Sequence, residues 1–231
     1  MKSASVDGAR AAGGIRGLIL DYGEVLCHRP APGRIGRMAE AAGMDAETFA
    51  VRYQQERGPY DRGDYSPEEY WSKVVPTPAP LGAELVERLR RWDVEMWSDL
   101  DGAMVDWLCE AHEAGFRTAV LSNMHADMAV HVRRSYGWLR CVDVAVLSCE
   151  LRLIKPDPAI YRRCLEGLEL QAAEACFIDD REVNVEGAEA VGLAGLQFRG
   201  VERLRHDLAA MGIAVLPRAA ANPSRSEAAA E

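Results

Sequence analysis

The chain has 231 residues, enough for one core domain and a smaller appended one, and its 48% hydrophobic and 27% charged residues are the balance of a globular rather than a disordered protein. The formal net charge of −9, from 36 acidic and 27 basic residues, disfavours nucleic acids and anionic membranes as partners. No apolar run approaches the roughly 20 residues that span a bilayer, so no membrane-spanning helix is expected.

The cysteines occur singly, with no Cys-x-x-Cys pair, at positions 27, 109, 141, 149, 164 and 176. Most of them lie in apolar stretches, so we expect buried free thiols in a reducing cytoplasm rather than a disulfide framework. Residues 1–14 carry one early lysine but no apolar segment after it, which predicts a flexible leader and not a secretory signal. Residues 217–231 have the composition of a disordered tail.

The first predicted strand is the apolar run GLIL, which ends at Asp21. Residues 34–92 then have a helical pattern, in which Gly43 is expected to end one helix and Asp45 to cap the next. The sequence Ser66-Pro67-Glu68-Glu69 is a capping box with proline at the first helical position, so a further helix should begin there.

After about Leu100, helical segments alternate with short apolar strands, whose sequences are FRTAVLS, VDVAVLS, ACFID and LAGLQF. This alternation predicts βαβ units and a parallel sheet covered by helices on both faces. The expected fold is therefore a doubly wound α/β core, residues 15–30 and 95–216. A helical cap domain, residues 31–94, interrupts the core after its first strand.

Polar residues follow the predicted strands, and in an open α/β sheet ligands bind at the carboxyl ends of the strands. Two adjacent carboxylates after a buried strand repel each other unless a cation or hydrogen-bond donors compensate them. The residues concerned are Asp21 and Gly23 after the first strand, Ser122 and Asn123 after the second, Lys155 in a later loop, and the pair Asp179 and Asp180.

Together these residue types fit phosphoryl transfer, which needs a nucleophile, a hard cation and donors for the phosphate oxygens. Asp21 is the candidate nucleophile, and Lys155 would neutralise phosphate and keep Asp21 ionised. Asp21 and the Asp179–Asp180 pair, with a backbone carbonyl near Gly23, offer the oxygen ligands that Mg²⁺ prefers. Ser122 and the neighbouring amides, with Asn123, would donate to phosphate oxygens.

The order of these motifs resembles the four-motif signature of the haloacid dehalogenase (HAD) superfamily over residues 15–200. The last motif is present in full, as Asp179, Asp180, Asn184, Ala188 and Gly192. The opening motif, D-x-G-x-V, is similar to that of the bacterial branch that contains glucose-1-phosphate phosphatases. The resemblance implies a cytoplasmic, magnesium-dependent phosphatase of a small phosphorylated metabolite, with an aspartyl-phosphate intermediate.

The chain departs from the superfamily pattern at Gly23, where most HAD phosphatases carry a second aspartate that protonates the leaving alcohol. Loss of a general acid–base group costs on the order of 10²–10⁴ in rate. One hypothesis is a phosphatase whose substrates need little protonation of the leaving group. A second is a 2-haloacid dehalogenase, since those enzymes also lack that aspartate. A third is a catalytically silent binding protein that keeps the fold.

The cap should select the leaving group, and the segment GPYDRGDYS, expected between two helices, is predicted to face the core site. Arg57 and Tyr60 are the candidate substrate contacts in this region. The alternative for Arg57 is an ion pair with Glu56 or Asp61.

Overall fold

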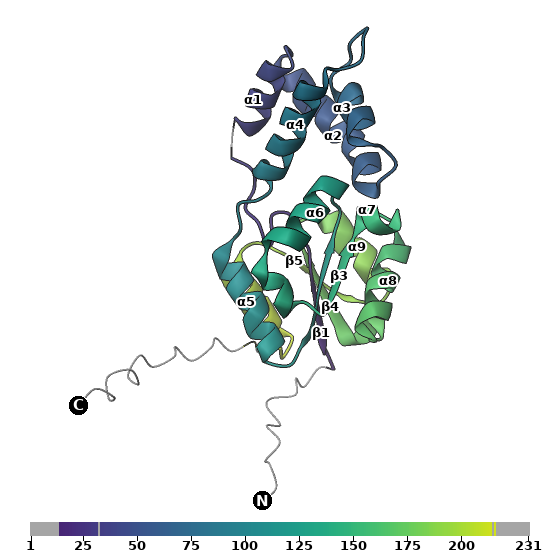
Figure 1. Ribbon diagram of the computed structural model, residues 1–231. Coiled ribbons are helices and arrows are strands. Elements are labelled where there is room, and N and C mark those ends of the chain that lie inside the picture. Colours follow the sequence, from purple (N-terminus) through teal and green to yellow (C-terminus); the bar gives the residue numbers. More distant parts are fainter. Residues whose placement is uncertain (1–13, 32, 214, 216–231) are drawn as a thin grey trace, which may run out of the picture.

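The computed structural model describes residues 14–31, 33–213 and 215. In these residues a core built on a parallel sheet carries a separate layer of four helices at one end (Figure 1). The predicted leader, residues 1–14, lies outside the described residues except for Gly14. The predicted tail, residues 217–231, also lies outside them. Among the described residues, no helix has both the length and the apolar character needed to cross a membrane.

The core sheet has five parallel strands in the order β3-β2-β1-β4-β5. The first strand is central, and its Leu20 lies opposite Val120 on one side and Ile178 on the other. β2 and β3 lie on one side of β1, and β4 and β5 lie on the other, so the carboxyl end of β1 is a topological switch point. The bounds are β1 Gly17–Leu20, β2 Arg117–Ser122, β3 Val144–Leu147, β4 Ala175–Asp179 and β5 Ala194–Gln197.

Helices cover both faces of this sheet, which confirms the predicted doubly wound α/β core (Figure 1). Successive side chains of β1 point to opposite faces: Leu18 packs in one cluster with Trp107 of α5, while Ile19 packs in another with Ile160 of α8. The core helices are α5 Gly102–Glu113, α6 Ala126–Ser135, α7 Ser148–Leu151, α8 Pro158–Leu168, α9 Glu182–Glu189 and α10 Val201–Ala210, with 3-10 turns η1 Gly137–Cys141 and η2 Ala172–Glu174.

The cap consists of α1 Arg34–Ala41, α2 Ala46–Arg62, α3 Pro67–Val74 and α4 Ala83–Met96. Its helix signals act locally as predicted: the Asp45 carboxylate accepts from the Thr48 amide at 2.8 Å, and the Ser66–Glu69 capping box is formed. Gly43 ends the first helix with a left-handed φ of 66°. Gly58 and Pro59, expected in a loop, instead lie inside α2, which ends at Arg62.

The two linkers between core and cap lie side by side. Cys27 and Leu100 form an antiparallel bridge, and the amides of His28 and Asp101 donate to the carbonyls of Asp99 and Leu26 at 2.7 and 3.0 Å. The Tyr22 hydroxyl donates to the Trp97 carbonyl at 2.7 Å, which ties the residue after Asp21 to the returning linker.

The cap is seated directly on the core. Arg90 of α4 makes two hydrogen bonds to the Asp127 carboxylate of α6, at 2.8 and 2.7 Å. The Ser148 hydroxyl donates to the Asp61 carbonyl at the end of α2, at 2.5 Å. Next to it, a Cβ added to Gly63 would lie 3.0 Å from the Cys149 carbonyl oxygen, so the two backbones approach closely.

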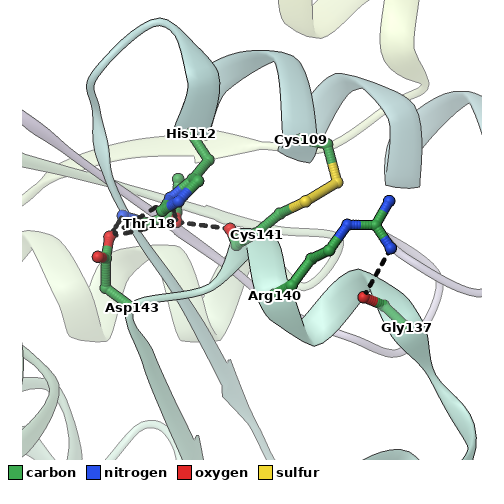
Figure 2. Close-up of a disulfide and its surroundings, with 7 residues drawn as sticks. All are labelled: Cys109, His112, Thr118, Gly137, Arg140, Cys141 and Asp143. Carbon is green, nitrogen blue, oxygen red and sulfur yellow. Dashed lines mark hydrogen bonds and ion pairs between the residues drawn. A yellow bond between two sulfur atoms is a disulfide. The ribbon is translucent and has the colours of Figure 1, made fainter.

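One disulfide joins Cys109 of α5 to Cys141 at the end of η1, with the two Cα atoms 5.0 Å apart (Figure 2). The prediction that all cysteines are free thiols is therefore wrong for this pair, which is separated by 32 positions in the sequence. The Thr118 hydroxyl of β2 donates to the Cys141 carbonyl at 2.7 Å beside the bond. The free thiols among the described residues are Cys27, Cys149, Cys164 and Cys176.

Candidate active site

The carboxyl ends of β1, β2 and β4 open into a cavity of about 660 Å³ between core and cap. Its core wall contains Asp21, Gly23, Ser122, Lys155 and Asp180, five of the residues that the sequence predicts for the site. The structure thus brings these strand-end residues together, because parallel strands end at the same edge of the sheet.

Asp21, Lys155 and Asp179 form a buried cluster. The Lys155 ammonium lies 2.8 Å from Oδ1 of Asp21 and 2.6 Å from Oδ2 of Asp179, and its side chain is 1% exposed. Burial raises the pKa of Asp21 to about 6, although Lys155 and a hydrogen bond from Ser122 act to lower it. The Asp21 carboxylate also accepts from the Tyr22 amide at 2.7 Å, which fixes its orientation.

Asp179 is fully occupied by protein donors. Its Oδ1 accepts from the Arg181 amide at 2.9 Å and from the Asn184 amide group at 3.0 Å. Its Oδ2 accepts from Lys155 and again from Asn184, at 2.6 and 3.1 Å. Asp179 therefore positions Lys155, and it has less capacity left for a cation than its place in the predicted metal set suggests.

Asp180 has the opposite environment. Burial and the nearby charges of Asp21, Asp179 and Glu24 raise the pKa of Asp180 to about 7. Within the described part of the chain, no lysine or arginine forms an ion pair with it. One oxygen each from Asp21, Asp179 and Asp180 lie within 4.8 Å of one another, so this is an all-oxygen donor set of the kind Mg²⁺ takes.

The two predicted phosphate contacts, Ser122 and Asn123, differ in what their side chains touch. Ser122 is buried in the cavity wall beside Asp21. Asn123 uses both ends of its side-chain amide on the Lys155 backbone, donating to the carbonyl at 3.1 Å and accepting from the amide at 2.8 Å. Asn123 thus holds the lysine loop in place.

The backbone does not require glycine at position 23. A Cβ there would meet the Trp97 ring at 3.7 Å, an ordinary contact, so the position has room for a side chain. Glu24, the neighbouring acid, lines the cavity but accepts from Arg29 at 2.6 Å. The missing aspartate is therefore not excluded by a lack of room at this position of the cavity lining.

The cap contributes Arg57 to the cavity, but not Tyr60. Arg57 pairs with Asp61 at 2.9 Å, as the alternative reading predicts, and with Asp93 at 2.8 Å. The Tyr60 ring is instead stacked between Tyr70 and His125, with centroids 4.0 and 4.8 Å away. The structure thus places Tyr60 in the packing between cap and core, outside the residues that line the cavity.

Sequence reasoning missed the buried charges around Arg57. Asp93 is fully buried, accepts from the Tyr53 hydroxyl at 2.6 Å, and lies 3.2 Å from Nε2 of the equally buried His125. Burial raises the pKa of Asp61 to about 6. The spacing of Arg57 and Asp61, four positions apart on a helix, is the one sequence signal that points to this cluster.

Comparison with known proteins identifies the same family. A family model of haloacid dehalogenase-like hydrolases matches residues 15–192. An (S)-2-haloacid dehalogenase from a Pseudomonas species is 28% identical over 90 residues, which are 39% of this chain and 40% of that protein. A sesquiterpene phosphatase from Aspergillus oryzae is 26% identical over 139 residues, covering 60% of this chain and 70% of that one. The chain spans less than half the length of several curated relatives, including the dehalogenase.

The fold is also that of solved HAD structures. A HAD family enzyme from Bacteroides thetaiotaomicron superposes with a TM-score of 0.70 at 20% identity, over 84% of this chain and 98% of that one. The same enzyme in complex with magnesium and inorganic phosphate has a TM-score of 0.61 at 19% identity, over 80% and 94% of the two chains. With its parallel sheet, its inserted cap and its match over residues 15–192, this chain belongs to the haloacid dehalogenase-like hydrolase family.

Proposed function

We propose that the protein is a magnesium-dependent phosphatase that hydrolyses a small phosphorylated metabolite through an aspartyl-phosphate on Asp21. The observation that carries this proposal is the Asp180 carboxylate, which lies in the cavity beside the nucleophile without a cationic partner among the described residues. Crowded carboxylates with raised pKa values are the environment that a hard cation stabilises.

In the reaction, an oxygen of Asp21 attacks phosphorus while the bond to the leaving oxygen breaks. Lys155 keeps the attacking carboxylate ionised and offsets phosphate charge, and Ser122 donates to a phosphate oxygen. Asp21 and Asp180, with a carbonyl near Gly23, would hold the metal, which when bound offsets the charge of the phosphate. Asp179 keeps Lys155 aimed at Asp21.

Two relatives support phosphate as the substrate group. The Bacteroides enzyme has been solved with magnesium and phosphate, and the Aspergillus relative is a phosphatase. A sugar 1-phosphate is our first candidate substrate, since its leaving hemiacetal oxygen is more acidic than that of an ordinary alcohol and depends less on the aspartate that Gly23 replaces.

The second candidate is hydrolytic dehalogenation of a 2-haloacid, favoured by Gly23 and by the Pseudomonas relative. It would use the same Asp21 to displace halide from carbon. Halide displacement from a 2-haloacid needs no metal, however, whereas the unpaired Asp180 beside Asp21 favours a reaction that uses a cation. For this reason we prefer the phosphatase.

The test is phosphate release from a panel of phosphorylated metabolites and p-nitrophenyl phosphate, with magnesium or with a chelator. Asp21→Asn is the inactive variant, and Asp106→Asn, at an exposed position on α5, is the matched control. We expect turnover that requires magnesium, disappears in Asp21→Asn and is unchanged in Asp106→Asn.

Phosphate release that is equal with magnesium and with chelator would contradict the metal assignment. If no ester is hydrolysed, chloride release from 2-chloropropionate would establish the dehalogenase. The absence of both activities would favour a silent binding protein.

A further inference from the structure

Ester hydrolysis through Asp21 needs a proton for the leaving oxygen and later a base for water, and Gly23 can supply neither. The acids that line the cavity are Asp21, Glu24, Asp61 and Asp180. Asp21 is the nucleophile, and Asp180 is the carboxylate assigned to the metal. Glu24 is held by Arg29 at 2.6 Å. Asp61 is the one that the proposed reaction does not yet use.

Asp61 enters the site from the cap. It lies in the last turn of α2, its side chain is only 9% exposed, and it lines the same cavity as Asp21. Its carboxylate Oδ1 is 2.9 Å from Nε of Arg57, which limits its rotation. Its backbone carbonyl accepts from the Ser148 hydroxyl of the core, so its position depends on a seated cap.

We propose that Asp61 is the acid–base residue of this enzyme, supplied by the cap in place of the side chain that Gly23 lacks. This inference rests on the proposed phosphatase function. In the first step, the Asp21 oxygen bonds to phosphorus, the leaving oxygen keeps the electron pair of the broken bond, and Asp61 gives that oxygen its proton. In the second step, Asp61 takes a proton from water as the water oxygen attacks phosphorus and Asp21 leaves as carboxylate. Phosphate departs, and Asp61 is again protonated.

The charges around Asp61 suit this role. Burial raises the pKa of Asp61 to about 6, opposed by Arg57 of the same helix and reinforced by Asp93 of α4 and Asp21 of the core. His125, which precedes α6 and lies against Asp93, has its pKa lowered to about 4 by burial, so it is neutral at the pH where Asp61 titrates. An acid with a pKa near the working pH is the efficient kind for both steps.

The first experiment compares Asp61→Asn with the wild type on esters of decreasing leaving-group acidity: p-nitrophenyl phosphate, phenyl phosphate and an alkyl phosphate. We expect kcat/KM for the alkyl ester to fall by about 10²–10⁴, the usual contribution of a general acid. The loss on p-nitrophenyl phosphate should be at least tenfold smaller, because that leaving group departs without a proton. Asp61→Glu should restore part of the loss on the alkyl ester.

Asp64→Asn is the matched control, since Asp64 lies just past the end of α2, pairs with Arg62 and Arg152, and does not line the cavity. It should leave the leaving-group dependence unchanged. The second readout is the pH profile of kcat/KM: the wild type should lose rate above about pH 6, as Asp61 ionises, and Asp61→Asn should lack that limb.

A structural or substrate-binding role for Asp61 predicts an equal loss on all three esters and an unchanged alkaline limb, and either result would overturn the inference. The proposed function would survive that result, because magnesium-dependent release by the wild type is measured in the same assay. Absence of release by the wild type contradicts the proposed function itself, and the role of Asp61 with it.

Discussion

At the scale of single residues, Lys155 is the most constrained charge of the site. It is a buried cation that faces two buried carboxylates, Asp21 and Asp179, at 2.8 and 2.6 Å. Its charge is stable, because the attraction of these carboxylates raises its pKa despite the opposing effect of burial. Removal of one member of such a cluster leaves the others without compensation.

We therefore predict that Lys155→Met abolishes turnover and lowers the free energy of unfolding at pH 8 by about 3–5 kcal/mol. The loss should be smaller at pH 5. Without the lysine, the pKa of Asp21, already raised to about 6, rises further, so the folded variant binds more protons than the unfolded chain. Its stability then falls as the pH rises.

Urea unfolding at both pH values measures this effect, with Lys73→Met, at an exposed cap position, as the control. A loss that is the same at pH 5 and pH 8 would contradict the explanation by uncompensated carboxylates.

Whether the sequence predicts a site residue depends on what fixes the position of that residue in the fold. Asp21, Ser122 and Asp180 lie at or just after the ends of buried strands, and parallel strands bring their ends together whatever else the chain does. Asp93 and His125 carry no such signal, because their proximity depends on how the cap is seated on the core. Tyr60 carries no such signal either, because its ring packs between cap and core.

At the scale of helices and strands, the caps of α2 and α3 were predictable because an N-cap and its partner amide lie three residues apart. The disulfide was not, because Cys109 and Cys141 are 32 positions apart and meet only through the packing of α5 against η1. The positions of the strands along the chain and the helical insertion follow from sequence patterns, but the strand order β3-β2-β1-β4-β5 required the structure.

The disulfide leads to a prediction for this part of the fold. Closing a loop of 32 residues in the unfolded chain corresponds to about 3–4 kcal/mol in the chain-entropy model. We expect the double variant, Cys109→Ser with Cys141→Ser, to have a free energy of unfolding lower by this amount, about 3–4 kcal/mol.

Added dithiothreitol should have the same effect on the wild type and none on the double variant. Cys27→Ser, which removes a buried free thiol, is the control for the loss of a cysteine as such. A wild type that is insensitive to reductant would contradict the prediction.

At the scale of the whole molecule, the site is complete only when the cap lies on the core. Gly63 is where the two backbones approach most tightly in this region, with a left-handed φ of 80° and a virtual Cβ at 3.0 Å from the Cys149 carbonyl. Gly115, after α5, has a φ of 93° and nothing within 4 Å of its virtual Cβ. A comparison of alanine substitutions at these two glycines therefore separates the effect of backbone strain from the effect of a poorly seated cap.

We predict that Gly63→Ala and Gly115→Ala each lower stability by about 1 kcal/mol, the cost of a side chain at positive φ. Only Gly63→Ala should also lower turnover, because the added methyl displaces the end of α2 and with it Asp61, two residues earlier. Thermal unfolding and phosphate release on the same preparations measure both quantities. Equal turnover in the two variants would show that this contact does not control the site.

The paired linkers have a mechanical consequence for the cap. Two strands of chain that are bridged at Cys27 and Leu100, with backbone hydrogen bonds on both sides of the bridge, resist twisting and sliding far more than bending. The cap is thus left with essentially one soft degree of freedom, rotation about an axis through the linkers. An arc of this kind returns the end of α2 to the same place over the nucleophile after each opening, so a group carried on a separate domain can be aligned as reproducibly as one built into the sheet.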